Sequence, residues 1–242
     1  MAINIRPYII INGKSSMEVS GLLITELPPI TKPQMRVTAE EIDGRDGDVV
    51  TELGFSAYDK PIKIGLHGDF DLDEIIDFFN QSGKVTFSNE PDKFYNFAQY
   101  DAIDFEKLIR FKTADVSFHV QPFKYSVSEG EKAFNFSSSV TTGELSIRNN
   151  GNYMSRPTFK LTGSGTVNLS INGIEVMVLD MSQNPVIILN SSEMNAYNPD
   201  NLLMNRNVTG NYDNLVLKSG KNTISFTGAV TQIAVNNYSR WL

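Results

Sequence analysis

Cysteine is absent from this chain of 242 residues, and histidine occurs only twice, as His67 and His119. The absence of cysteine excludes disulfides, thiolate nucleophiles and cysteine-ligated metals. Each histidine lies in a segment with strand character and has no catalytic motif around it, so we interpret both as ordinary strand residues. The sequence therefore gives no support to an active site built on cysteine or histidine.

The chain also lacks a basic cluster and a long apolar run. Its isoelectric point is about 4.9 and its net charge is −7, so it lacks the phosphate-neutralising surface that nucleic-acid binding requires. Residues 1–6 contain no apolar core of signal-peptide length, and no later run approaches the roughly 20 apolar residues of a membrane span. We expect no sequence-specific nucleic-acid binding and no membrane insertion, and we expect folding in a cytoplasm.

The acidic residues are concentrated in the first half. Residues 1–128 contain 13 Lys and Arg against 20 Asp and Glu, whereas residues 129–242 contain eight of each. This contrast predicts two halves with different uses. The length is compatible with one large domain or two of about 120 residues, and either can bury a substantial core.

The most distinctive stretch is the charged loop at residues 40–50. It contains two Asp-Gly pairs and one arginine among its carboxylates, and segments 34–42 and 49–57 on either side have strand character. Glycine accepts positive φ, so the chain can reverse direction here at little steric cost. The pattern predicts a long hairpin with a charged, exposed tip. Because the loop has no cysteine, histidine or serine nucleophile, contact between surfaces suits it better than catalysis.

One segment of the first half has helical periodicity. Residues 71–82 carry a single apolar stripe, Asp71 and Glu74 resemble a capping box, and Gly83 follows where a C-terminal cap is expected. The remaining segments are predicted to be strands, with boundaries at residues 3–11, 61–67, 84–88, 93–100, 102–111 and 113–123. The first half is therefore predicted to be a β-rich domain with one helix.

The second half is predicted to be a β-sandwich or jelly roll. A polar, serine-rich stretch at 126–139 marks the expected boundary, giving domains 1–126 and 127–242. Short apolar runs separated by Gly, Asn and Ser follow. Asn172-Gly173 is the strongest hairpin signal in the chain, and two further strands are expected at 222–227 and 230–236. The predicted fold class is thus mainly β, that is, a β-rich α+β protein.

Two alternative functions follow from aromatic and acidic residues. Exposed aromatic side chains on a β-sandwich can stack on sugars, and the candidates are Tyr197, Tyr212, Tyr238 and Trp241. The carboxylates at 69–77 could be a catalytic pair of a glycosidase, although at a helix start they are better explained by the helix dipole and solvent. We identify no catalytic, cofactor-binding or metal-binding residues and expect no enzyme.

Four features of the chain occur together: the acidic, strand-rich first half with one helix, the turn-rich second half, segment 149–159 (NNGNYMSRPTF), and the closing segments 228–233 and 238–241. In this combination the chain resembles the distal tail proteins (Dit-like proteins) of siphophages and prophages of Gram-positive bacteria. The resemblance spans nearly the whole chain. It rests on dispersed patterns and not on a catalytic motif.

The resemblance implies a structural protein of the virion, located at the phage tail tip and assembled in the bacterial cytoplasm. It implies a tail-tube-like N-terminal domain that forms a hexameric ring, followed by a galectin-like C-terminal β-sandwich. The implied partners are the major tail tube protein, a tail-associated lysin or fibre, and a receptor-binding protein. Because an arginine among acids can form charge-assisted hydrogen bonds across a repeated interface, the candidate inter-subunit contacts are Asp43, Arg45, Asp46 and Asp48.

Overall fold

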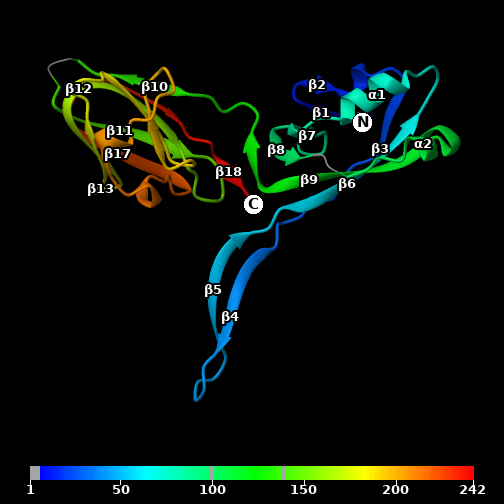
Figure 1. Ribbon diagram of the computed structural model, residues 1–242, viewed down its shortest axis with the longest axis horizontal. Coiled ribbons are helices and arrows are strands. Elements are labelled where there is room, and N and C mark those ends of the chain that lie inside the picture. The colour runs from blue at the N-terminus through cyan, green and yellow to red at the C-terminus, as the bar shows by residue number, and fades with distance from the viewer. Residues whose placement is uncertain (1–5, 99–100, 138–139) are drawn as a thin grey trace, which may run out of the picture. The chain divides into compact units, whose positions relative to one another are not determined.

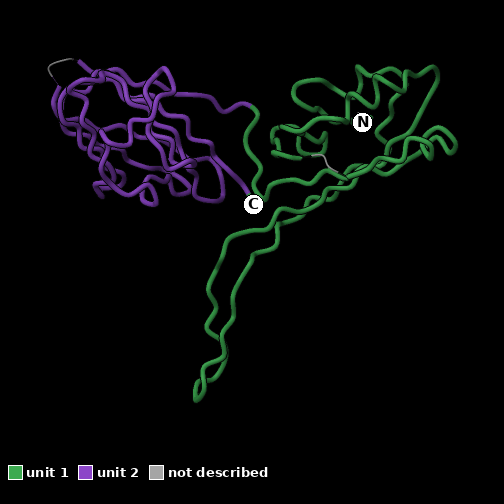
Figure 2. Tube along the Cα trace, viewed as in Figure 1, with its two compact units in different colours: residues 1–127, 242 green, residues 128–241 purple. Residues whose placement is uncertain are grey.

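The computed structural model describes residues 6–98, 101–137 and 140–242. The chain divides into two compact units, residues 1–127 with Leu242 as unit 1 and residues 128–241 as unit 2 (Figure 2). Antiparallel strands dominate both units (Figure 1). This confirms the prediction of a mainly β protein.

Unit 1 contains a sheet in the order β2-β1-β7-β8-β9-β6-β3. The strands and α-helices of unit 1 are β1 (Ile9–Ile11), β2 (Lys14–Ser15), β3 (Leu22–Glu26), β4 (Met35–Glu41), β5 (Asp48–Phe55), β6 (Tyr58–Leu66), α1 (Leu72–Phe79), β7 (Gly83–Phe87), β8 (Lys93–Ala98), α2 (Phe105–Phe111) and β9 (Thr113–Ser126). Residues 3–5 and 99–100 of two predicted strands lie outside the described residues. Of the described remainder, residues 9–11 form β1 and residues 93–98 form β8, whereas residues 6–8 are not strand.

The core of unit 1 is built by alternating side chains of the sheet and by α1. Phe118 of β9 is fully buried and meets the rings of Phe79, Phe87 and Phe97 at centroid distances of 5.1–6.4 Å. Ile75 and Phe78 of α1 are buried in the same cluster. The predicted apolar stripe of the helix is therefore what holds α1 on the sheet.

Helix α1 is shorter than the predicted range of 71–82. Asp71 caps it as expected, since its Oδ1 accepts hydrogen bonds from the amides of Asp73 at 2.9 Å and Glu74 at 3.3 Å. The capping box is not completed, because Glu74 binds Lys14 and the Ser20 amide. Gly83 does not cap the helix either: it begins β7, and the helix ends at Asn80.

The prediction of a strand at 102–111, and with it the prediction of one helix, is wrong. Residues Phe105–Phe111 form α2, so the described residues contain two α-helices. Asp104 caps α2 by accepting the Lys107 amide at 2.8 Å, and Lys112 ends it in the left-handed conformation with φ 58°. The apolar residues of this segment fit both a helical and a strand periodicity. The aspartate cap favours the helix.

Strands β4 and β5 form a separate two-stranded sheet, which we call the arm (residues 35–55). Figure 1 shows it extending beyond the rest of unit 1. Its register runs from Met35 opposite Phe55 to Glu41 opposite Asp48, with one irregularity after Arg36. The predicted long hairpin with a charged tip is confirmed.

Unit 2 is a β-sandwich built around two long strands, β12 (Thr158–Ile171) and β17 (Gly220–Asn236), which pair with each other. The other strands of its sheet are β10 (Lys132–Asn135), β11 (Thr142–Asn149), β13 (Ile174–Asp180), β14 (Val186–Asn190), β15 (Asn195–Tyr197) and β16 (Val208–Gly210). The short strand β18 (Arg240–Trp241) is not part of this sheet. Asn172 (φ 52°) and Gly173 (φ 80°) form the predicted hairpin turn between β12 and β13.

The two long strands take part in both layers of the sandwich. The first half of β12 pairs with β14 and the second half with β13, while β17 pairs with β11 in its first half and β10 in its second. The register shifts between these halves, as expected where strands switch sheets. Gly228 lies at this corner with φ 108°, and a Cβ there would come within 2.3 Å of the Thr166 carbonyl oxygen. The two strands predicted at 222–227 and 230–236 are therefore one bent strand.

Candidate interaction site: the arm and its base

The arm exposes apolar side chains that have no cover within the described residues. Val37, Ile42, Val50 and Leu53 are 49–56% exposed. Every other arm side chain is exposed as well, except the partly buried Met35 and Val49 and the buried Phe55. A two-stranded hairpin is only marginally stable by itself, and exposed apolar groups together with free strand edges favour contact with another molecule.

The register places like charges opposite each other near the tip. Glu41 is the partner of Asp48 in the last pair of the ladder. Directly opposed like charges destabilise a strand pair. A cation contributed by a neighbouring molecule would relieve this repulsion, so the tip is suited to bind a positively charged group.

The tip gathers the four residues predicted for inter-subunit contact. Asp43, Arg45 and Asp46 lie in the loop between the strands, and Asp48 opens β5; all four are exposed. The Arg45 amide donates to the Ile42 carbonyl at 3.1 Å, and Gly44 and Gly47 adopt φ 81° and 74°. No ion pair of the Arg45 guanidinium occurs within the described part of the chain. The contact of these four tip residues with another subunit stays a prediction.

The arm is fixed to unit 1 at its base. Phe55 is buried against the edge of Phe123, with a ring-centroid distance of 5.7 Å. The Ser56 amide donates to the Gln34 carbonyl at 2.9 Å, which closes the base of the hairpin. The connection from β3 into the arm, residues 27–34, contains three prolines and therefore offers few amide donors.

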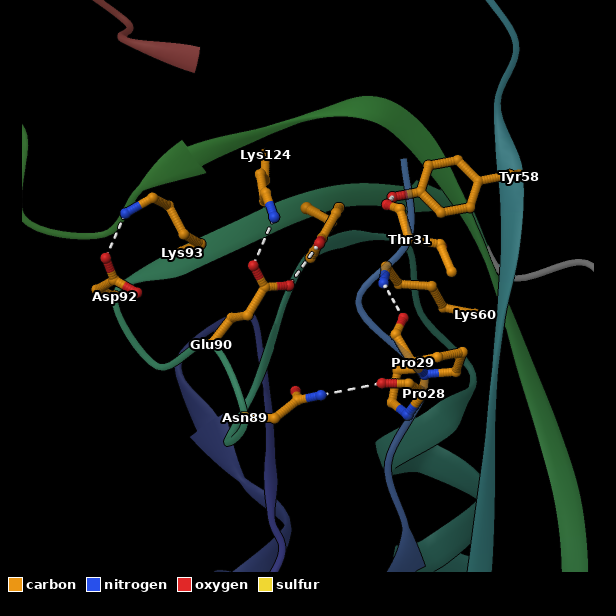
Figure 3. Close-up of polar contacts among 11 residues, drawn as sticks. Pro28, Pro29, Thr31, Tyr58, Lys60, Asn89, Glu90, Asp92, Lys93 and Lys124 are labelled. Carbon is orange, nitrogen blue, oxygen red and sulfur yellow. Dashed lines mark hydrogen bonds and ion pairs between the residues drawn. The ribbon is translucent and has the colours of Figure 1, made fainter. Parts of the chain in front are cut away.

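Three side chains hold this connection through its carbonyl groups (Figure 3). Asn89 Nδ2 donates to the Pro28 carbonyl at 2.9 Å, Lys60 Nζ to the Pro29 carbonyl at 3.0 Å, and the Tyr58 hydroxyl to the Thr31 carbonyl at 3.5 Å. Pro28 and Pro33 are also buried. The carbonyls of a proline-rich segment are thus satisfied by donors from β6 and from the turn between β7 and β8.

Lys60 is the unusual member of this group, because only 2% of its surface is exposed. Its ammonium lies 4.8 Å from the ring centroid of Tyr95, 5.5 Å from that of Tyr58 and 5.8 Å from that of Phe87. These distances are within the range of cation–π attraction. Burial lowers the pKa of Lys60 to about 8; the negative charge of Glu90 opposes this change and the positive charge of Lys124 adds to it.

A largely buried ion pair lies beside Lys60. Glu90 Oε1 accepts from Lys124 Nζ at 2.5 Å, and Glu90 Oε2 accepts from the Tyr95 hydroxyl at 2.8 Å. The side chains of Lys124 and Glu90 are 11% and 13% exposed. Burial, followed by the hydrogen bond to Glu90, raises the pKa of Tyr95. We call Lys60, Glu90, Tyr95 and Lys124 the base cluster.

Sequence analysis did not identify the base cluster. Its members lie on β6, β8, β9 and the turn between β7 and β8, up to 64 positions apart, and they meet only in the folded sheet. The strand predicted to start at residue 61 in fact begins at Tyr58 and includes Lys60. The proline-rich connection before the arm was the one available signal that the base is rigid.

The four aromatic candidates for glycan stacking belong to unit 2, and their environments differ. Tyr197 is partly exposed and its hydroxyl donates to Glu193 at 2.7 Å. Tyr212 packs against the core of unit 2, its hydroxyl is buried, and burial raises its pKa to about 12. Tyr238 is 45% exposed with φ 47°, and Trp241 is partly buried in β18. Of the four, Tyr238 is the one that is exposed, whereas Tyr197, Tyr212 and Trp241 are partly buried. Sugar binding stays a prediction.

The two histidines lie in different surroundings. His67, predicted to be part of a strand, follows the end of β6 at Leu66, and its backbone amide donates to the Gly21 carbonyl at 2.9 Å. His119 Nδ1 lies 2.7 Å from Asp59 Oδ1, opposite it across β6 and β9. Within the described ranges no three His, Asp or Glu side chains gather closely enough to hold a metal ion. The same ranges contain no helix that is both long and apolar enough to cross a membrane.

The chain is similar in fold to a solved phage protein. The crystal structure of SPP1 Dit (gp 19.1), a paradigm of the hub adsorption apparatus in phages that infect Gram-positive bacteria, matches 98% of this chain and 99% of its own, with a TM-score of 0.64 and 15% identity. A chain of the phage P2 baseplate in its activated conformation with Ca matches 92% of this chain and 97% of its own, with a TM-score of 0.48 and 11% identity. No protein-family model and no curated protein matches the sequence.

Proposed function

We propose that this chain, which shares the SPP1 Dit fold over nearly its full length, is a non-enzymatic structural protein of a phage tail. It forms a ring at the distal end of the tail and connects the tail tube to the baseplate. The observation that carries this proposal is the coverage of 98% and 99% of the two chains. Both units and their order are therefore matched, and not one common β-sandwich alone.

In this proposal the two domains have different roles. Residues 1–126 are a tail-tube-like domain that forms a hexameric ring, and residues 127–242 are a galectin-like domain. The ring contacts the major tail tube protein on one side and a tail-associated lysin or fibre on the other. A receptor-binding protein attaches to the assembly, and the protein resides at the tail tip of the virion.

The arm supports the proposal of a ring. Closed rings are built from heterologous interfaces, in which a projecting element of one subunit meets a different surface of the next. The arm offers free strand edges, exposed apolar side chains and a charged tip. Arg45 is the cation at this tip and Asp43, Asp46 and Asp48 are its acids, so the tip can form charge-assisted hydrogen bonds with a neighbour.

The first test is the molar mass of the purified protein by size-exclusion chromatography with light scattering, over a range of protein and salt concentrations. We expect a species near six times 27.0 kDa. A strict monomer under all conditions would contradict ring formation by the isolated chain. Co-purification with the tail tube protein would then decide whether partners are needed for assembly.

Charge reversal tests the role of the arm tip. We expect Arg45→Glu to form rings only at a protein concentration at least ten times higher than the parent requires. Its unfolding midpoint should be unchanged, because Arg45 has no ion pair to lose within the described residues. Arg110→Glu makes the same change in charge on α2, where the side chain is 68% exposed, and serves as the control. Full rings with Arg45→Glu would remove Arg45 from the interface.

A further inference from the structure

Lys60 raises the question of why a cation is buried at the base of the arm. A buried ammonium loses its hydration, and an apolar side chain of similar length would fill the same space without that cost. Lys60 is 2% exposed and is not bonded to a carboxylate; its nearest anion, Glu90, binds Lys124 and Tyr95. Its described hydrogen bond goes to the Pro29 carbonyl at 3.0 Å. This bond is what distinguishes lysine from an apolar residue at this position.

The segment that Lys60 holds leads directly into the arm. Pro28, Pro29 and Pro33 restrict the backbone of the connection, because each fixes its own φ and restricts the residue before it. A stiff connection transmits its direction to whatever follows it. The arm begins at Met35, only six residues after the carbonyl that Lys60 binds.

The other two ties on this connection are more open to solvent. Asn89 is exposed, and the Tyr58 hydroxyl reaches the Thr31 carbonyl only at 3.5 Å. Water competes with hydrogen bonds at exposed groups. The Lys60 bond is only partly buried, but Lys60 is the one donor of the three whose side chain is buried. The rings of Tyr58, Phe87 and Tyr95 surround the ammonium and keep it in place.

We propose that Lys60 is a positioning residue for the arm: its caged ammonium binds the Pro29 carbonyl and thereby fixes the direction in which the arm leaves unit 1. This inference rests on the proposed function in one respect, namely that the arm contacts a neighbouring subunit. Its structural content, the fixed direction of the arm, can be tested independently of any assembly.

The chain has no cysteine, so two introduced cysteines can be spin-labelled without background. We place labels at Thr51→Cys, exposed on β5, and Asp77→Cys, exposed on α1, and measure their distance distribution by electron–electron double resonance in dilute, monomeric protein. We expect a narrow distribution in the labelled parent. The variant Lys60→Met keeps the length and the apolar stem of the side chain. In this variant we expect the width of the distance distribution to increase at least twofold.

Lys63→Met is the matched control. Lys63 is on the same strand, but it is exposed and pairs with Glu26 of β3. The Lys63→Met variant should leave the distance distribution unchanged. An unchanged width in folded Lys60→Met would overturn the inference, and equal broadening in both variants would do the same, because the effect would then belong to any loss of charge on β6.

The same variants separate the inference from the proposed function. If Lys60→Met broadens the distribution but rings form as in the parent, Lys60 positions the arm and a fixed arm direction is not needed for assembly. If Lys60→Met does not fold, the labelled parent still tests the inference, because a broad distance distribution in the folded parent would overturn it. In the same protein the ε-methylene protons of Lys60 should be shifted upfield by the three rings, and random-coil shifts would contradict the cage that the inference requires.

Discussion

The buried charge of Lys60 should make the stability of unit 1 depend on pH in a specific way. Its folded-state pKa is about 8, whereas the ordinary value is 10.5. Between these values the unfolded chain binds a proton that the folded chain does not, so stability rises with pH across this window. Below pH 8 both states are protonated and the full penalty of burying the charge applies.

The magnitude follows from the difference between the two pKa values. Each tenfold change in proton affinity is worth about 1.4 kcal/mol, so the difference corresponds to roughly 3 kcal/mol. Cation–π attraction by the rings around Lys60 favours the charged form and reduces this figure, at about 0.5–2 kcal/mol per good contact. We therefore expect a gain of about 2 kcal/mol between pH 7 and pH 10.

The assay is urea unfolding of the parent and Lys60→Met at a series of pH values from 7 to 10. The informative quantity is the difference between the two free energies of unfolding, because other titrating groups contribute to both proteins and cancel. Burial raises the pKa of Tyr58 and Tyr95, so both phenols lose their protons less readily in the folded state than in the unfolded state. A difference that is flat within about 0.5 kcal/mol would refute the buried-cation reasoning.

Two further predictions concern the core of unit 1 and the independence of the arm. Phe118→Ala removes a fully buried ring that meets three others and should lower the free energy of unfolding by about 3–5 kcal/mol; a loss below about 1 kcal/mol by urea titration would contradict this packing. Replacing residues 37–53 by Asn-Gly should leave the unfolding midpoint of unit 1 unchanged, because no side chain of this range belongs to its buried cluster. The same replacement should abolish rings in light scattering. Unfolding of the shortened protein would show that the arm supports the core.

The features that sequence analysis predicted correctly are those set by neighbouring residues. The arm follows from alternating strands on both sides of two Asp-Gly pairs, and the turn at Asn172-Gly173 follows from the tolerance of its two residues for positive φ. The caps of α1 and α2 are also local. Asp104 carried the same signal as Asp71, and giving it more weight than the apolar alternation would have identified α2.

Features built from distant segments were not predictable in this way. The bend that makes β17 one strand in two layers depends on Gly228 lying against the Thr166 carbonyl, 62 positions earlier. The cage around Lys60 requires β7 and β8 to bring Phe87 and Tyr95 beside β6. The alternation of β6 does place Lys60 on the buried face with Ile62 and Ile64 and Lys63 on the exposed face, but the predicted strand begins at residue 61 and so leaves Lys60 out.

The arm combines a weak tip with a firm base, and this combination has a physical reason. A free hairpin with exposed valines and opposed Glu41 and Asp48 gains little stability by itself, so its order must come from unit 1 or from a partner. A fixed base lowers the entropy that the arm loses when it binds, and preorganisation of this kind strengthens association without any new contact. If the arm binds a neighbouring subunit as proposed, the cost of burying Lys60 is balanced by that association and not within the monomer. On this reasoning, the affinity lost in Lys60→Met should exceed anything expected from a residue that lies outside the interface.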